Sequence, residues 1–154
     1  MTTRGLERLK EAGVPFEELT YRPDEEGVRF AARRLGLDAE TVIKTLVFRA
    51  DSQEFLFALM GGDGNVSEKK LARASGHKQV SPASPRDAER ISGYEIGGIS
   101  PLGAKRRLPV VLDHALTGHA SVVINAGARG TLVRLAILDL IALVDAMVAD
   151  IRVE

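Results

Sequence analysis

The sequence predicts a single α+β domain in which helices flank a mixed, curved or barrel-like β-sheet. The chain has 154 residues, which is the length of one domain with one substantial core. Predicted strands outnumber predicted helices, and several strands follow one another closely enough to pair antiparallel. Strands and helices do not alternate regularly, which argues against a doubly wound parallel sheet. Because no repeat, low-complexity tract or linker divides the chain, we expect one domain over residues 1–154.

Helices and strands of the first half are marked by apolar spacing and by glycine. Leu6, Leu9 and Ala12 recur at helical spacing ahead of Gly13, which predicts a helix over 3–12. The further elements predicted here are a strand over 15–21, a helix over 25–35 with Gly36 as its C′ residue, and strands over 42–49 and 54–60 joined through 51–53.

Capping residues mark two helices in the second half. Ser67 begins a helix that runs to Ser75, and Ser84 with Pro85 begins another that ends near Gly93. The remaining predicted elements are strands over 108–113, 121–125 and 131–135, a helix over 136–146 and a short strand over 148–153.

Opposite charges balance, with 21 Lys and Arg residues against 21 Asp and Glu residues. A protein that binds nucleic acid through its overall charge is normally basic, so any RNA contact has to use a local patch. Basic residues gather within 69–78 and at 105–107. The run 105–107 is either a solvated edge or, beside a glycine-rich loop, a contact for RNA phosphates.

Several site classes are excluded or disfavoured by composition. The absence of cysteine excludes a disulfide framework, a zinc–thiolate site and a cysteine nucleophile. His77, His114 and His119 do not share metal-ligand spacing, and we expect neither a metal nor a cofactor. No apolar run is long enough to cross a membrane and no apolar signal segment begins the chain, so we expect a cytoplasmic protein.

Lys44 is the most informative single residue, because the strand predicted over 42–49 surrounds it with apolar neighbours. Alternate side chains of a strand share a face, and those on the Lys44 face are Val42, Leu46 and Phe48. A lysine there has to reach water, find an anionic partner or lose its charge. It is either a strand-end lysine whose ammonium reaches solvent or a cation at the mouth of a pocket.

The segment 93–103 holds four glycines and one proline, which preclude regular structure over most of it. Gly97-Gly98 permits a close approach of the backbone to a ligand, and the amides there can donate to a carbonyl or a developing oxyanion. The segment matches neither a phosphate-binding P-loop nor a dinucleotide fingerprint. It is either a tight connection between a helix and a strand or a ligand-binding loop.

Three further features have simple structural explanations. The turn that carries Arg129 after the strand of 122–125 is explained as a hairpin turn. The glycines of 61–65 are explained in the same way in preference to a phosphate-binding loop. Asp139 falls in the first turn of the last helix, where the helix dipole favours an acid without any ligand.

Taken in order, these segments resemble the YbaK family of freestanding prolyl-tRNA editing proteins. The resemblance spans nearly the whole chain. The motifs that carry it are Ile43-Lys44-Thr45-Leu46, Gly93-Tyr94, Gly97-Gly98-Ile99-Ser100-Pro101-Leu102-Gly103, Gly127-Ala128-Arg129-Gly130 and Asp139-Leu140. This sequence departs from the family in a short segment between Tyr21 and Lys44, and in lacking a proline just before Asp139.

The resemblance implies a β-barrel-like fold and an aminoacyl-tRNA deacylase that discharges wrongly charged tRNA(Pro). The glycine-rich loop is closest to the branch that acts on Cys-tRNA(Pro), in which the substrate's own thiol attacks its ester. Catalytic roles would fall to Lys44, Gly97 and Gly98, with amides near Gly98 binding the carbonyl oxygen. The positions that would bind substrate are Tyr21, Thr45, Ile99, Ser100, Pro101, Gly127, Arg129 and Asp139.

Two other functions remain compatible with the sequence. One keeps the reaction but changes the amino acid, for example to alanine on tRNA(Pro). The other is a binding module that recognises tRNA ends or a small ligand without turnover. The expected partner is the acceptor end of mis-charged tRNA, with or without prolyl-tRNA synthetase, and both a monomer and a homodimer are compatible with the sequence.

Overall fold

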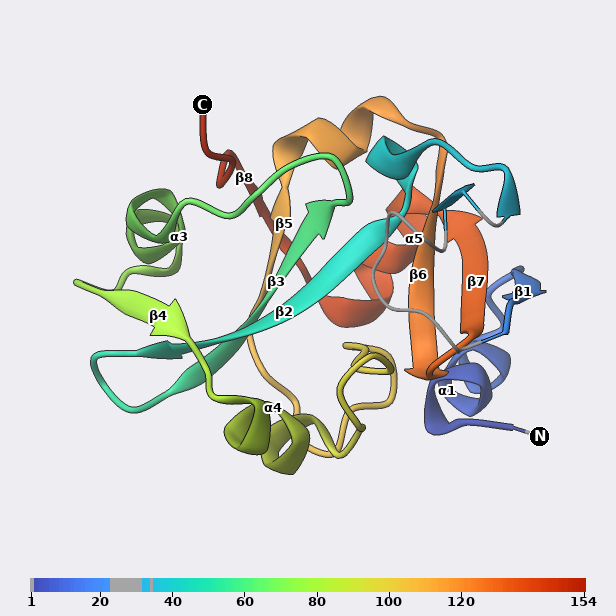
Figure 1. The fold of residues 1–154 in the computed structure, drawn as a ribbon, viewed down its shortest axis with the longest axis horizontal. Helices are drawn as coiled ribbons and strands as arrows, with labels where there is room; N and C mark the ends of the chain where they lie inside the picture. The colour runs from blue at the N-terminus through green and yellow to red at the C-terminus, as the bar shows by residue number, and fades with distance from the viewer. Residues whose placement is uncertain (1, 23–31, 34) are drawn as a thin grey trace.

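The computed structural model describes residues 2–22, 32–33 and 35–154. Its strands form two sheets, shown in Figure 1: a five-stranded sheet of order β4-β2-β3-β5-β8 and a three-stranded sheet of order β1-β7-β6. The helices are α1 (Arg4–Ala12), α3 (Glu68–Ser75), α4 (Pro85–Ser92) and α5 (Ile137–Val144), with 3-10 turns η1 (Ala39–Thr41) and η2 (His114–Gly118). The strands are β1 (Glu17–Thr20), β2 (Ile43–Ala50), β3 (Phe55–Gly61), β4 (Val80–Pro82), β5 (Val110–Asp113), β6 (Ser121–Ala128), β7 (Thr131–Ala136) and β8 (Met147–Ala149).

The predicted α+β class is confirmed, but the described strands do not close into a barrel. β2 pairs antiparallel with β3, whereas β3 pairs parallel with β5, and β5 pairs parallel with β8. β4 and β8 are open edges of the larger sheet. Among the described residues, the two sheets are joined by an isolated bridge between Val42 and Val123. The barrel-like closure that the resemblance implied is therefore replaced by two open sheets.

Local capping signals position the helices as predicted. The hydroxyls of Thr3, Ser67 and Ser84 each accept a main-chain N–H in the first turn of α1, α3 and α4. Gly13, Gly76 and Gly93 end these three helices in the left-handed conformation that glycine adopts without strain.

The structure contains one strand that was not predicted and shortens another, and one predicted helix falls mostly outside its described part. β4 was not predicted, because three residues that end in Pro82 give no strand pattern. The strand expected over 148–153 is the shorter β8, after which the chain leaves the sheet. Most of the helix predicted over 25–35 lies outside the described residues, although Ala32 and Leu35 are helical and Gly36 has a φ of 68°.

The apolar core is divided by the larger sheet, whose central strand β3 is buried on both faces. Phe57 and Leu59 belong to the main cluster, which also takes in α1, α5, β6 and β7. Leu56 and Met60 belong to a second cluster beneath α3. Residues of β2 alternate in the same way: Ile43 and Val47 pack in the main cluster, whereas Leu46 and Phe48 pack in the second.

Candidate active site

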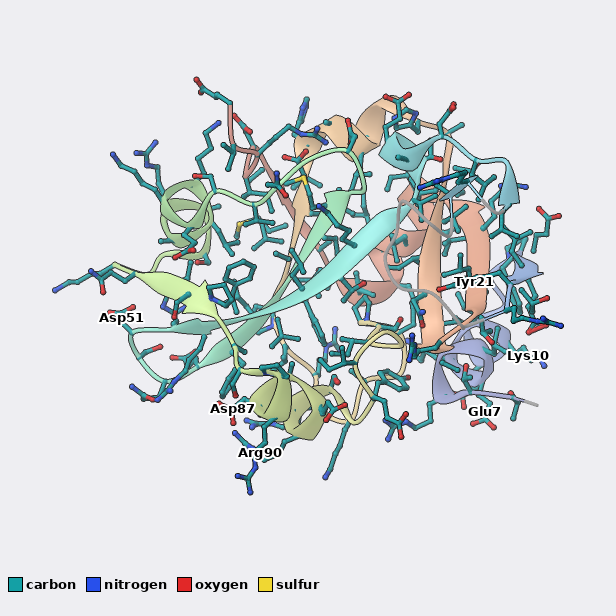
Figure 2. The ribbon with its side chains drawn as sticks, in the orientation of Figure 1. Glu7, Lys10, Tyr21, Asp51, Asp87 and Arg90 are labelled. Carbon is teal, nitrogen blue, oxygen red and sulfur yellow. The ribbon has the colours of Figure 1, made fainter. Side chains whose placement is uncertain are left out.

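A cavity of about 450 Å³ opens along β2. Its walls are mostly apolar and come mainly from residues 42–48, from 82–88 at the end of β4 and the start of α4, and from the loop after α4. Five of the predicted site residues line it: Tyr21, Lys44, Thr45, Gly97 and Ile99. Tyr21 follows β1 and is half-buried against the smaller sheet (Figure 2). The cavity therefore brings Lys44 and Thr45 of β2 together with Gly97 and Ile99 of the glycine-rich loop.

The edge of β2 that faces the cavity is open at Thr45. The carbonyl of Val42 accepts from Gly62 on the β3 side, whereas the carbonyl of Val47 accepts from Ala83 on the opposite side. Main-chain groups alternate between the two edges of a strand, so those of Thr45 point to the same edge as those of Val47. β4 pairs only with 48–50, and no described residue pairs with the Thr45 main chain on this edge.

The side chain of Thr45 adds a second unpaired group. Its hydroxyl oxygen is buried and has no hydrogen-bond partner among the described residues. A buried polar atom without a partner costs about 1–3 kcal/mol, so such atoms are rare unless a ligand or water satisfies them. Thr45 thus presents main-chain and side-chain polar groups beside the same apolar cavity.

Lys44 projects from the opposite face of β2, as the alternation predicted. Its neighbours on that face, Leu46 and Phe48, pack in the cluster beneath α3, whereas Ile43 and Val47 pack in the main core. The Lys44 side chain is half-buried, lines the cavity, and donates from its ammonium to the carbonyl of Gly64. The turn of 61–65 is not the predicted hairpin turn, because it leads from β3 to α3, and its Gly64 carbonyl binds the lysine.

The glycine-rich loop is held by side chains from its own ends and from β6. The Tyr94 hydroxyl donates to the carbonyl of Leu102 at 2.6 Å, and the Ser100 hydroxyl accepts from the Leu102 amide at 3.1 Å. Burial raises the pKa of Tyr94, so its hydroxyl keeps its proton at neutral pH. Asn125 donates to the carbonyl of Gly97 at 3.0 Å and accepts from the Gly127 amide at 2.7 Å.

The available amide donors of this loop flank Gly98. The Gly98 amide itself donates to the carbonyl of Glu95 at 2.9 Å, and Gly98 is buried outside the cavity wall. Gly97 and Ile99 do line the cavity, and neither amide has an acceptor within the described parts of the chain. Among the amides near Gly98 that were expected to bind a carbonyl oxygen, those of Gly97 and Ile99 are therefore available, whereas that of Gly98 is occupied.

Gly127 and Arg129 support this loop from outside the cavity. A Cβ added at Gly97 would lie 2.8 Å from the Arg129 side chain, and one added at Gly127 would lie 2.7 Å from the Tyr94 ring. Glycine at both positions allows the β6–β7 turn to pack directly on the loop.

The other predicted positions are not brought to the cavity. Ser100 is fully buried within the loop, and Pro101 lies on a separate surface depression beside α5. Asp139 lies in the first turn of α5 as predicted, half-buried and away from the cavity wall.

Asn125 is the site residue that sequence reasoning missed. It lines the cavity and connects the carbonyl of Gly97 to the amide of Gly127. The available signal was an asparagine at the end of the otherwise apolar strand predicted over 121–125. Nothing in that signal identifies Gly97, 28 positions away, as its partner.

Over the described residues, no cluster of His, Cys, Asp and Glu side chains is arranged to hold a metal ion. In the same part of the chain, no helix is long and apolar enough to span a membrane.

The fold and the cavity together define a small α+β editing domain, with one lysine and main-chain donors around an apolar cavity. The chain belongs to the aminoacyl-tRNA editing domain family, whose model matches residues 23–143. The resemblance to the YbaK family, first inferred from the sequence motifs, is thereby confirmed.

Individual relatives agree with this assignment. A protein of Enterococcus faecalis named as a candidate Cys-tRNA(Pro)/Cys-tRNA(Cys) deacylase, EbsC, is 29% identical over 99% of this chain and 94% of its own. A proline–tRNA ligase of Pelobacter propionicus is 32% identical over 77% of this chain, which spans 21% of that ligase. A solved structure described as a candidate trans-editing enzyme for prolyl-tRNA synthetase has a TM-score of 0.84 and 25% identity, covering 100% of this chain and 99% of its own.

Proposed function

We propose that this protein is a deacylase that removes the amino acid from mis-charged tRNA(Pro), with Cys-tRNA(Pro) as its preferred substrate. Family membership supports the reaction class, and the names of the relatives support cysteine and proline tRNA. The observation that carries the proposal is the cavity itself. This cavity of about 450 Å³ has mostly apolar walls, and it combines a lysine, an unpaired strand edge and two available loop amides.

These groups match the parts of an aminoacyl ester. The ester carbonyl oxygen becomes negative as a nucleophile attacks, and the Gly97 and Ile99 amides would donate to it. The aminoacyl group would lie along the open edge of β2, where Thr45 offers a donor and acceptors. The Lys44 ammonium would orient the terminal adenosine or stabilise negative charge on the departing ribose oxygen.

The protein would supply position and electrostatics, and the substrate would supply the nucleophile. The cysteine thiol attacks its own ester carbonyl, so that a carbon–sulfur bond forms and the carbon–oxygen bond to the ribose breaks. The thiol proton passes to the ribose oxygen, and the products are a cyclic thiolactone and free tRNA. Holding the thiol close to the carbonyl raises the rate of such an intramolecular reaction.

A panel of mis-charged tRNAs tests this function. Purified protein incubated with Cys-tRNA(Pro) and Ala-tRNA(Pro) should discharge the cysteine ester faster, because alanine has no thiol to attack. Faster discharge of alanine would overturn the thiol mechanism but keep the deacylase. If neither ester is cleaved faster than in buffer, the enzyme proposal fails, and measurable tRNA binding would then favour a module without turnover.

Replacing Thr45 with valine should separate activity from stability. Valine keeps the shape of threonine but removes the unpaired hydroxyl, so the free energy of unfolding should stay constant or rise by about 1 kcal/mol. If the hydroxyl binds substrate, the kcat/KM for deacylation should fall about tenfold. Thermal unfolding and single-turnover discharge of Cys-tRNA(Pro) measure the two effects. An unchanged kcat/KM would show that the hydroxyl does not contact substrate.

The acceptor end of tRNA is the proposed partner, which would place the protein in the cytoplasm. The exposed run 105–107 follows the glycine-rich loop and offers a local basic patch for RNA phosphates.

We also propose that residues 1–154 act as one editing unit, because α1 braces the loop. Arg4 donates to the carbonyl of Gly93 at 3.0 Å, and its guanidinium lies 4.9 Å from the centre of the Tyr94 ring.

A further inference from the structure

The C-terminal segment 150–154 lies outside the residues matched by the family model and pairs with the connection between β3 and α3 (Figure 1). The Ser67 amide donates to the carbonyl of Ile151 at 2.7 Å, and the Val153 amide donates to the carbonyl of Asn65 at 2.9 Å. Arg152 lies between these two hydrogen bonds. The end of the chain is therefore fixed against the same turn that binds Lys44.

The guanidinium of Arg152 joins two carboxylates. It contacts both oxygens of Asp63, at 3.1 and 3.3 Å, and one oxygen of Asp113 at 3.3 Å. Asp113 is only 1% exposed, and its other oxygen accepts from the Ile151 amide at 3.1 Å. A planar guanidinium can make all three contacts at once, whereas a lysine ammonium cannot reproduce this fork.

Arg152 also lies directly against the turn of 61–65. A Cβ added at Gly64 would lie 2.6 Å from one of the guanidinium nitrogens, so this close approach requires glycine. The Gly64 amide donates to the carbonyl of Gly61 at 3.0 Å, which closes the turn. The Gly64 carbonyl then accepts the Lys44 ammonium. Contacts thus run without a break from buried Asp113 to the lysine of the cavity.

We propose that Arg152 is a positioning residue for Lys44: through Asp63 and the Gly64 turn, it fixes the place of the ammonium at the cavity. We call Arg152, Asp63, Asp113 and the turn of 61–65 the Arg152 clamp. The position of the ammonium is argued from these contacts, whereas the effect on catalysis rests on the proposed deacylase function.

The clamp is in place at neutral pH. The hydrogen bonds from Arg152, and to a smaller extent the charge of Lys44, lower the pKa of Asp63 below its ordinary value. Asp63 therefore stays ionised until the pH falls below the range in which a free aspartate takes up its proton.

The first test observes Lys44 directly and needs no activity. In protein labelled with ¹⁵N-lysine, the side-chain signal of Lys44 is assigned by its loss in Lys44→Met. Asp63→Asn and Arg152→Lys should both shift this signal and speed its exchange with water. The matched control is Asp150→Asn, which breaks the ion pair from Lys70 at 3.0 Å but keeps an oxygen for the Arg152 amide. A Lys44 signal unmoved in both clamp variants would overturn the proposal.

The second test is a double-mutant cycle on deacylation. Arg152→Lys should lower kcat about tenfold and leave KM nearly unchanged in the wild-type background. In the Lys44→Met background it should lower the residual rate no further, because Arg152 acts through Lys44. Equal losses in both backgrounds would identify Arg152 as merely structural and overturn the positioning role. If the wild-type protein deacylates no tRNA, the proposed function fails, and the lysine signals alone decide whether the clamp exists.

Discussion

Replacing Lys44 with methionine should lower the kcat/KM for Cys-tRNA(Pro) by about 100-fold, the usual effect of losing one preorganised charge or donor at a developing negative charge. The stability of the folded protein should not decrease. Methionine preserves the apolar stem, which packs on the side of Leu46 and Phe48, and removes the cost of keeping a charge half-buried. Single-turnover discharge measures the rate, and thermal unfolding shows that the fold is intact.

The control is Lys10→Met, which removes a lysine from the exposed face of α1 (Figure 2). Both variants change the net charge of the chain equally, so any loss from general attraction between protein and tRNA appears in both. If the Lys44→Met protein keeps half of the wild-type rate, Lys44 takes no part in the mechanism. Normal tRNA binding with no discharge, by contrast, would assign the lysine to the chemical step.

Features that depend on local sequence were predicted correctly. The caps at Ser67 and Ser84 and the glycine stops act within one helical turn, so the neighbouring residues are enough to define them. The position of Lys44 on the face of Leu46 follows from the two-residue period of a strand. That period is already present in the eight residues of β2.

Features that depend on contacts between distant segments could not be predicted. The open edge at Thr45 exists because β4 is short and reaches only 48–50, and no pattern in β2 shows where its neighbour ends. Arg152 lies 89 positions from Asp63 and 39 from Asp113, so only the fold brings these charges together. The Gly98 amide is another case, because a turn bond to Glu95 occupies a donor that the glycine pair alone made available.

Replacing Gly97 with alanine should lower kcat/KM by about 30-fold and the free energy of unfolding by about 1–2 kcal/mol. Gly97 has a φ of 92°, which an L-residue with a Cβ rarely adopts. The added Cβ would also lie 2.8 Å from the side chain of Arg129. Relief of this contact would move the loop and lengthen the hydrogen bond from Asn125. The movement would also displace the amides of Gly97 and Ile99.

Gly76→Ala provides the matched control, because it separates backbone strain from loss of the site. Gly76 has a φ of 80°, but a Cβ added there meets nothing within 4 Å, and the residue ends α3 away from the cavity. It should lose a similar amount of stability and keep its deacylation rate. Equal rates for the two variants, measured at a temperature where both are folded, would mean that the loop amides do not bind the ester carbonyl. A selective loss in Gly97→Ala would instead show that the rate depends on the placement of this loop beside β6.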